Sequence, residues 1–331
     1  MRLIDKLINQ IDNKYLPPQG TDLVVAVSGG VDSVALVHLL LRLANQYDWD
    51  LTVAHFDHQL RKTSQRDAEF VQKLAKNLGL DYVSAKTNVS VLAKRERLTI
   101  EEAARKARYD FLQQVARRRR ALIVTGHTAD DQLETVVMNW LRGGGVRALA
   151  GMRDLDNNIW RPLLSITKTQ IKEFVRQYQL TYREDETNQQ TKFKRNLIRH
   201  KVMPTLRLVN PSLEQVLLRN AKVMASLADF VGQETARLYK KMAKSQKDAI
   251  WLDLKKLNQL PEFLRNEVIL FTIRQLQGHQ QDIKKIHLDE VQKIINSAEG
   301  KVWKQLPGKL FVSNRYGKIG FSRYRPKFLN R

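Results

Sequence analysis

The first two thirds of the sequence predict an α/β fold, in which a parallel sheet is covered by helices on both faces. Short apolar segments rich in β-branched residues alternate with longer amphipathic segments, as in strand–helix crossover units. The first apolar segment, residues 23–27 (LVVAV), is apolar at every position, which is typical of a strand buried within a parallel sheet.

The predicted elements follow one another in a regular order. Strands are expected at 23–27, 51–55, 81–86 and 121–125. Apolar positions at helical spacing predict a helix after each strand, at 33–44, 64–78, 99–118 and 129–141. Ligands of such sheets bind beyond the carboxyl ends of the strands. We therefore expect three segments to share one rim of the sheet: 28–33, 55–61 and 126–134.

The remainder of the chain has a different pattern. Residues 142–152 (RGGGVRALAGM) contain three consecutive glycines and predict a mobile linker or a lid. Pro204 and Pro211 interrupt the pattern, so we expect a first domain over 1–208 and a smaller accessory domain over 209–331. The accessory domain is predicted to be mainly helical, at 212–242, 262–277 and 285–297, with a short β tail at 301–325.

The composition excludes several classes of protein. With 43% hydrophobic and 27% charged residues, the 331-residue chain is neither collagen-like nor wholly disordered. Cys is absent, so the sequence offers no disulfide, zinc–thiolate site or thiol nucleophile. No apolar run approaches the roughly 18–20 residues that cross a bilayer, and the first residues do not form a secretory signal. We expect a cytoplasmic protein without a membrane partner.

The net charge indicates the kind of partner. The chain has 57 Lys and Arg residues against 34 Asp and Glu residues, which gives a formal charge of +23. An excess of this size favours a polyanionic partner, above all a nucleic acid, over a merely soluble basic protein.

The segment Ser28-Gly29-Gly30-Val31-Asp32-Ser33 predicts a phosphate-binding loop, because it joins a buried strand to a helix. The glycines let backbone amides approach an anion, the two hydroxyls can donate to phosphate oxygens, and the helix begins with its positive dipole end. Asp32 would repel phosphate, so we expect it to hold a Mg²⁺ ion that bridges the phosphates. The alternative is a glycine-rich tight turn.

Two common nucleotide-binding motifs are absent from the sequence. It contains neither GxxxxGK[ST], with its lysine for the γ-phosphate, nor the GxGxxG that opens a dinucleotide fold. The loop at 28–33 resembles instead the PP-loop of the N-type ATP pyrophosphatases, a Rossmann-like superfamily of the adenine nucleotide alpha hydrolase type. This resemblance implies that ATP is cleaved between its α- and β-phosphates and that a substrate is adenylated.

Further sequence blocks narrow the resemblance within the superfamily. They are Phe56–Arg61 (FDHQLR), Ala104–Tyr109 (ARKARY), Gly126–Thr135 (GHTADDQLET), Arg161–Leu164 (RPLL), and Glu184–Asn188 (EDETN) followed by Arg195, Asn196 and Arg199. Together with the loop, these blocks resemble the tRNA(Ile)-lysidine synthetase family over residues 23–204.

The resemblance implies a two-step reaction. ATP adenylates the carbon-2 carbonyl oxygen of the wobble cytidine in a tRNA(Ile) with a CAU anticodon, and pyrophosphate leaves. The amine of free L-lysine then attacks that carbon and displaces AMP, which leaves lysidine in the tRNA. The implied partners are therefore this tRNA and free lysine, with ATP and Mg²⁺ as cofactors.

Acidic residues next to the predicted rim suit this chemistry. Asp130, Asp131 and Glu134 stand at helical spacing and follow His127, so they could hold lysine or Mg²⁺, with Asp32 and Asp131 as the metal ligands. A carboxylate could also accept the proton that the lysine amine must lose. The alternative is an acidic first helical turn that only stabilises the helix dipole.

Arginines and histidines complete the candidate site. Arg105 and Arg108 share one helix face and could neutralise the departing pyrophosphate, although Glu101 and Glu102 could instead pair with them. For His55, His58 and His127 we prefer neutral hydrogen-bonding roles to a metal triad.

Basic residues indicate where RNA would bind. A stripe after residue 191 contains Lys192, Lys194, Arg195, Asn196, Arg199, Lys201 and Arg207. The tail after residue 301 interleaves basic residues with aromatics such as Trp303, Phe311 and Phe321, which could stack on bases or form the core of a small sheet.

Two other functions compete with this interpretation. A tRNA thiolase of the same superfamily also adenylates a base, but its sulfur chemistry generally depends on cysteines, which this sequence lacks. A non-catalytic RNA-binding module would not need paired carboxylates beside a phosphate loop. The sequence does not fix the oligomeric state, and a homodimer is one option.

Overall fold

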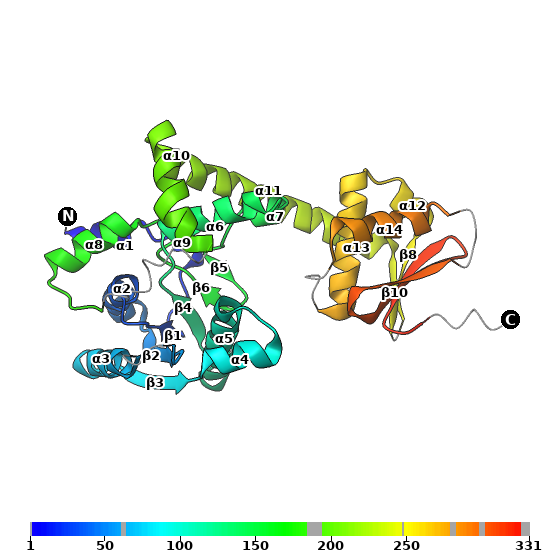
Figure 1. Ribbon diagram of the computed structural model, residues 1–331. Coiled ribbons are helices and arrows are strands. Elements are labelled where there is room, and N and C mark those ends of the chain that lie inside the picture. The colour runs from blue at the N-terminus through cyan, green and yellow to red at the C-terminus, as the bar shows by residue number, and fades with distance from the viewer. Residues whose placement is uncertain are drawn as a thin grey trace. The chain divides into compact units, whose positions relative to one another are not determined.

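The computed structural model describes residues 2–60, 64–183, 194–246, 248–278, 283–297 and 302–325. Contacts between residues divide the chain into two compact units, Met1–Ala225 and Ser226–Arg331 (Figure 1). Among the described residues, no helix is both long enough and apolar enough to span a membrane.

The first unit is built on a six-stranded sheet with the strand order β3-β2-β1-β4-β6-β5. The strands are β1 (Asp22–Ala26), β2 (Asp50–Asp57), β3 (Asp81–Lys86), β4 (Leu122–Thr125), β5 (Leu155–Asp156) and β6 (Ile159–Trp160). All neighbouring strands pair in parallel except β5 with β6. The predicted parallel α/β fold is therefore confirmed.

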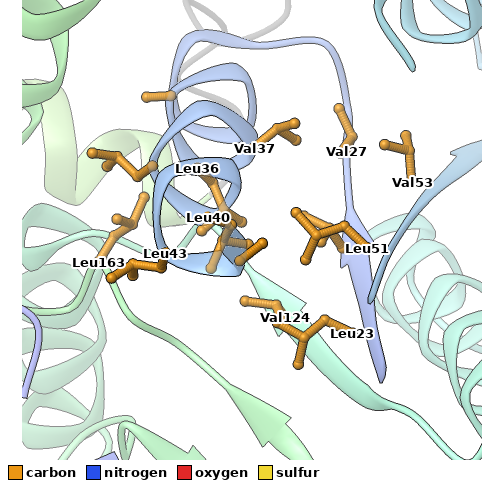
Figure 2. Close-up of a cluster of buried hydrophobic side chains, with 14 of the residues drawn as sticks. Leu23, Val27, Leu36, Val37, Leu40, Leu43, Leu51, Val53, Val124 and Leu163 are labelled. Atoms are coloured by element: carbon orange, nitrogen blue, oxygen red, sulfur yellow. The ribbon is translucent and has the colours of Figure 1, made fainter. Parts of the chain in front are cut away.

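Helices cover both faces of this sheet. They include α2 (Val31–Tyr47), α3 (Ser64–Asn77), α4 (Val89–Glu96), α5 (Ile100–Arg119) and α8 (Lys168–Gln177). On one face, Leu36 and Leu40 of α2 pack beside Leu23 and Leu51 of the sheet (Figure 2). On the other face, Leu112 of α5 belongs to a second apolar cluster with residues of β1 and β4. A strand sequence that is apolar at every position fits this two-sided burial.

Short elements precede and follow these helices. The chain begins with α1 (Leu3–Ile8) and the 3-10 turn η1 (Asn13–Tyr15). After β4 come α6 (Ala129–Leu141) and α7 (Val146–Leu149), and later α9 (Lys194–Leu197), the π-helical turn η3 (Ile198–Val202) and α10 (Met203–Val209). The short elements α1, α4, α7 and the β5–β6 pair were not predicted.

The long helix α11 (Leu213–Met242) bears on the expected domain boundary. Its first residue, Leu213, is buried in a cluster with Leu133 of α6 and Ile198 of η3. Its last residue, Met242, belongs to the core of the second unit. The contacts therefore divide the chain within this helix, after Ala225, rather than at the prolines before it, where we expected residue 208 to end the domain.

Among the described residues, the second unit combines the last part of α11 and three further helices with a five-stranded antiparallel sheet of order β7-β8-β11-β10-β9. The helices are α12 (Leu254–Asn258), α13 (Glu262–Gln277) and α14 (Lys285–Ile295), and the strands are β7 (Ala243–Gln246), β8 (Ala249–Asp253), β9 (Trp303–Leu306), β10 (Leu310–Arg315) and β11 (Lys318–Ser322), with the 3-10 turn η4 (Pro307–Lys309). Helices and a β tail were expected, but β7 and β8 were not.

The glycine-rich stretch 142–152 lies within the first unit and is tied to α6. The Gln132 side-chain amide donates to the carbonyl oxygens of Ala150 and Met152, at 3.2 and 2.9 Å, and accepts from the Met152 amide at 2.7 Å. Asn139 donates to the carbonyl of Ala148 at 2.7 Å. The stretch is therefore not a linker between the units, and its role as a lid stays a prediction.

Candidate active site

Hydrogen bonds between its own hydroxyls and backbone groups fix the conformation of the loop between β1 and α2. The Ser33 hydroxyl accepts from the Gly29 amide at 3.2 Å and donates to the Gly30 carbonyl at 2.9 Å, and the Ser28 hydroxyl accepts from the Gly30 amide at 3.3 Å. The two hydroxyls lie 3.3 Å apart. Backbone amides and hydroxyls thus gather at the start of α2, where the helix dipole is positive.

Gly29 is required by both its backbone and its surroundings. Its φ of +90° lies in the region that favours glycine, and a Cβ atom there would lie 3.3 Å from Phe70 and 3.3 Å from Val71. Its carbonyl accepts a hydrogen bond from the Arg183 amide at 2.9 Å. A residue from the later part of the first unit, Arg183, therefore helps to fix the phosphate loop.

Asp32 projects from the first turn of α2 toward the next loop. Its Oδ1 atom is buried without a hydrogen-bond partner among the described residues, and its Oδ2 atom lies 3.6 Å from the Nζ atom of Lys168. Burial raises the pKa of Asp32 and Asp131 adds to this, while Lys168 opposes it. The carboxylate thus has an unused oxygen and is short of positive charge.

The loop between β4 and α6 lies against the phosphate loop. A Cβ atom on Gly126 would come within 3.3 Å of the Asp32 carbonyl oxygen, which shows how closely the two backbones approach. The Thr128 amide and hydroxyl both donate to Oδ2 of Asp131, each at 3.0 Å, and this caps the first turn of α6. The cap turns the other oxygen of Asp131 toward the site.

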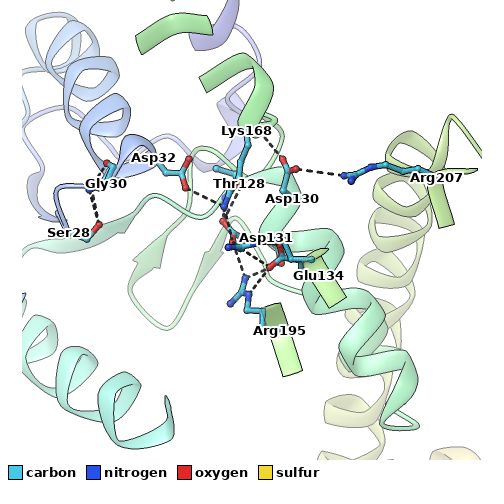
Figure 3. A network of polar contacts seen from close by, with 12 residues as sticks. Ser28, Gly30, Asp32, Thr128, Asp130, Asp131, Glu134, Lys168, Arg195 and Arg207 are labelled. Carbon is cyan, nitrogen blue, oxygen red and sulfur yellow. Dashed lines mark hydrogen bonds and ion pairs between the residues drawn. The ribbon is translucent and has the colours of Figure 1, made fainter. Parts of the chain in front are cut away.

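Two arginines bind the carboxylates of α6, and Figure 3 labels one of them, Arg195. Arg195 donates to Oε2 of Glu134 at 2.8 Å and to Oδ1 of Asp131 at 3.0 Å. Arg199 donates to both oxygens of Glu134, at 2.6 and 3.0 Å, and lies 3.4 Å from Oδ1 of Asp131. Burial alone would raise the pKa of Asp131, but Lys168, Arg195 and the Thr128 amide outweigh it and lower the pKa.

Asp130 points away from the other two carboxylates. Its Oδ2 atom accepts from the backbone amide of Lys168 at 2.7 Å, at the first residue of α8. Its Oδ1 atom lies 4.0 Å from Arg207, which also pairs with Glu214 of α11. Although sequence spacing groups Asp130 with Asp131 and Glu134, the structure uses it to hold a neighbouring helix (Figure 3).

The three histidines follow strands β2 and β4 or lie at their ends, at the same rim of the sheet. His55 is buried and its Nδ1 atom lies 2.8 Å from the Val27 carbonyl oxygen, while Nδ1 of His127 lies 2.8 Å from the Thr125 hydroxyl. Burial, aided by Arg108, lowers the pKa of His58 to about 4, and burial also lowers the pKa of His127, although Asp131 opposes it. Both imidazoles are therefore neutral at pH 7. Within the described ranges, no group of three or more His, Cys, Asp or Glu residues could hold a metal ion.

Arg105 and Arg108 both lie against the ring of Tyr109 on α5. Their guanidinium carbons lie 4.9 and 5.2 Å from the centre of the Tyr109 ring. Burial lowers the pKa of Arg108, and Arg105 and Arg195 add to this. Glu102 is engaged in the helix cap with Thr99, and no ion pair joins either arginine to a carboxylate in the part of the chain that is described. This positive charge remains available to an anion.

The predicted RNA-binding stripe divides into different environments. Arg195 and Arg199 face the carboxylates of α6, Arg207 pairs with Glu214, and Lys201 is exposed. Lys192, the block 184–188 and the side chain of Lys194 lie outside the described residues, as does Arg61, and Asn196 lies on α9. In the tail, Phe321 is fully buried in the sheet core, while Arg325 lies 4.8 Å above the ring of Trp303.

Lys168 is the site residue that the sequence did not reveal. It follows the RPLL block by four positions, and its Nζ atom lies 3.6 Å from Asp32 and 3.9 Å from Asp131. The RPLL match drew attention to this region, but no residue pattern indicated that the chain returns there to the phosphate loop.

Comparisons with known proteins agree with this geometry. A family model described as "PP-loop domain" matches residues 3–206. The tRNA(Ile)-lysidine synthase of Thermosipho africanus is 37% identical over 70% of this chain and 54% of its own length. That of Thermotoga maritima is 31% identical over 91% of this chain and 70% of its own. Among solved structures, the U34-tRNA thiolase NcsA from Methanococcus maripaludis, with its [4Fe-4S] cluster, superposes with a TM-score of 0.56 at 17% identity, covering 67% of this chain and 78% of that one.

The chain is shorter than the relatives that it matches. It spans 54%, 66% and 65% of the length of three tRNA(Ile)-lysidine synthases, those of Thermosipho africanus, Dehalococcoides mccartyi and Geobacter sulfurreducens. The solved structure supports the fold alone, whereas the sequence matches extend across both units. The chain belongs to the PP-loop family and, within it, to the tRNA(Ile)-lysidine synthases.

Proposed function

We propose that this protein ligates free L-lysine to carbon 2 of the wobble cytidine in a tRNA(Ile) with a CAU anticodon, using ATP and releasing AMP and pyrophosphate. The observation that carries the proposal is the meeting of an anion-binding loop with the Asp131–Glu134–Arg195–Arg199 cluster at one rim of the sheet. The relatives named tRNA(Ile)-lysidine synthase support the choice of substrates.

The phosphate loop binds the triphosphate of ATP. The amides of Gly29 and Gly30 and the hydroxyls of Ser28 and Ser33 are the donors, and they would exchange their present bonds within the loop for phosphate oxygens. Arg105 and Arg108 carry positive charge without a carboxylate partner among the described residues, which suits the departing pyrophosphate.

Asp32 and Asp131 fit a Mg²⁺ ion. Asp32 has a buried oxygen without a partner, and Oδ2 of Asp32 and Oδ1 of Asp131 both face the Lys168 ammonium. Mg²⁺ commonly takes one or two protein carboxylates and completes its shell with water and substrate phosphates, so two carboxylates suffice. When bound, the ion would neutralise negative charge on the triphosphate.

Adenylation makes the cytosine reactive. The carbon-2 carbonyl is a poor electrophile because the ring nitrogens donate electrons into it, and linking its oxygen to AMP supplies a good leaving group. The oxygen attacks the α-phosphorus of ATP and the bond to the β-phosphate breaks. The wobble base must leave its stack to reach the loop, and the +23 charge favours binding of the RNA backbone.

The cluster on α6 suits the second substrate. Free lysine carries an α-carboxylate and two amino groups, and the cluster offers both arginines and carboxylates within a few ångströms. Arg195 and Arg199 can bind the carboxylate of lysine, while Asp131 can hold an ammonium group and accept the proton that its amine loses before it attacks carbon 2. Glu134, which is 3% exposed and bound by both arginines, holds them in position. The amine then displaces AMP.

The other candidates explain less. A thiolase mechanism has no sulfur carrier here, because the sequence lacks Cys, and a non-catalytic RNA-binding module leaves the paired carboxylates without a role. The proposed substrates, tRNA and free lysine, support a cytoplasmic location for the reaction. The homodimer stays a prediction.

The test is incorporation of radiolabelled lysine into RNA. We expect label in tRNA(Ile) with a CAU anticodon, release of AMP and pyrophosphate in equal amounts, and no label when the wobble base is changed to uridine. Pyrophosphate release should require the tRNA. Formation of ADP and phosphate, or label that enters the uridine-containing tRNA equally well, would contradict the proposal.

A further inference from the structure

Lys168 lies between two carboxylates that come from the first turns of two different helices, α2 and α6. Its Nζ atom is 3.6 Å from Oδ2 of Asp32, on the β1–α2 side, and 3.9 Å from Oδ1 of Asp131, on the β4–α6 side. Figure 3 shows the side chain reaching from the start of α8 into the gap between them. The ammonium is a positive charge beside Asp32, whose side chain is 25% exposed and whose Oδ1 atom is buried.

This contact differs in kind from the arginine contacts next to it. Arg195 and Arg199 form hydrogen bonds of 2.6–3.0 Å to the carboxylates of α6. At 3.6 and 3.9 Å from the two carboxylates, the Lys168 ammonium makes longer contacts and interacts with them mainly as a point charge. Such contacts are easier to exchange than the forked hydrogen bonds of the arginines.

The backbone of Lys168 is anchored, and its side chain, which is 27% exposed, ends between the two carboxylates. The amide of Lys168 donates to Asp130 at 2.7 Å, and Thr167 caps the same helix by accepting from the Gln170 amide at 3.3 Å. Rotation about the bonds of the Lys168 side chain can therefore move the ammonium while the backbone stays in place. The anion-binding loop at 28–33 begins the helix that carries Asp32, so this anion site lies beside the present position of the ammonium.

We propose that Lys168 is a transferable counter-charge: without nucleotide its ammonium neutralises Asp32 and Asp131, and when a divalent cation and a nucleoside triphosphate bind, it moves onto a phosphate oxygen. A cation coordinated by these carboxylates and an ammonium beside the same two groups repel each other, so binding of the cation favours departure of the ammonium. The sequence has no P-loop lysine, and Lys168 supplies that charge from another helix. This inference rests on the proposed function only in taking ATP as the anion.

The test measures two binding reactions of the nucleotide-free full chain, and neither uses tRNA or lysine. Mn²⁺ alone is titrated and followed by electron paramagnetic resonance, and α,β-methylene ATP with Mg²⁺ is titrated by calorimetry. Lys168→Met should bind Mn²⁺ about three- to tenfold more tightly, because the competing charge is gone. It should bind the nucleotide about tenfold or more weakly. Lys172→Met, an exposed lysine one turn further along α8, is the matched control and should change neither.

Opposite changes in the two affinities distinguish this role from a structural one. If Lys168→Met weakens both, or leaves nucleotide affinity unchanged, the inference is wrong. Lys168→Arg, which keeps the charge, should keep nucleotide affinity and gain none for Mn²⁺. If Lys168→Met does not give the thermal unfolding curve of the wild type, Lys168→Gln replaces it under the same criteria. If Lys168→Met changes the Mn²⁺ and nucleotide affinities in opposite directions but the wild-type protein does not transfer lysine to the tRNA, the proposed function is wrong and the role of Lys168 still holds.

Discussion

Arg199 binds Glu134 in a bidentate manner: its Nε atom donates to Oε1 at 2.6 Å and its Nη2 atom donates to Oε2 at 3.0 Å. Only 3% of Glu134 is exposed, so this carboxylate depends on its two arginines for charge compensation. The contact joins α6 to the helical segment that starts at residue 194, 65 residues apart in the sequence. The candidate site is therefore also part of what holds the first unit together.

Glu134→Gln should destabilise the first unit by about 2–4 kcal/mol, because two half-buried arginines lose a charged partner. Urea unfolding of the purified variant measures this loss. Glu214→Gln is the control: its partner Arg207 is 40% exposed, so the expected cost is below about 1 kcal/mol. Equal costs for the two variants would contradict the importance given to burial at Glu134.

Asp32→Asn should abolish function without harming the fold. The pKa of this carboxylate is raised by burial, so removing its charge relieves a desolvation cost. We expect an unchanged or higher melting temperature, with pyrophosphate release reduced about 100-fold or more. Filter binding should show tRNA affinity close to that of the wild type. Full activity in Asp32→Asn would remove this residue from the proposed metal site.

Asp130→Ala separates the three acidic residues of α6 by role. The variant loses the acceptor for the Lys168 amide, so we expect about 1 kcal/mol less stability and about tenfold slower pyrophosphate release. Asp253→Ala removes a similar helix cap, in which Asp253 accepts from the Lys256 amide, and should cost similar stability with no loss of activity. Complete inactivity of Asp130→Ala would instead favour a direct catalytic role.

The pH dependence of stability should report His58. Its pKa is about 4 in the folded protein and near 6.5 in the unfolded chain, so between these values the unfolded chain binds more protons. The stability due to a neutral His58 is therefore full above pH 6.5 and is lost as the pH falls toward 4. We expect the urea midpoint of the wild type to fall from pH 7 to pH 5, and that of His58→Gln to fall less. Equal falls would show that His58 is not the group responsible.

The sequence predicted elements whose signal is local and strong. The limits of β3 at 81–86 and of α6 at 129–141 match the predicted ones. Turn residues and regularly spaced apolar positions mark both elements in the local sequence. The two-residue strands β5 and β6 carry no periodicity that could be recognised, and β7 has only exposed or half-exposed residues. Such strands form because a neighbouring strand offers pairing partners, which the local sequence does not encode.

The candidate site was predicted only in part for a related reason. The phosphate loop and the acidic turn of α6 are contiguous motifs, and the parallel topology places both at one rim. The roles of the basic residues depend on contacts across long stretches of chain, such as Arg195 with Glu134 or Lys168 with Asp32. Residue spacing grouped Arg195 with an RNA-binding stripe, and only the folded chain brings it to the carboxylates.

The first turns of α6 contact three neighbours: Asp130 accepts from the backbone amide at the start of α8, Asp131 faces the Lys168 ammonium, and Glu134 binds the arginines. An α-helix turns by about 100° per residue. One residue inserted between Thr128 and Asp130 would swing every one of these carboxylates away from its neighbour together. A substitution in this turn removes one contact at a time, whereas an insertion or deletion disrupts all three together. This turn should therefore tolerate side-chain substitutions far better than a change in length.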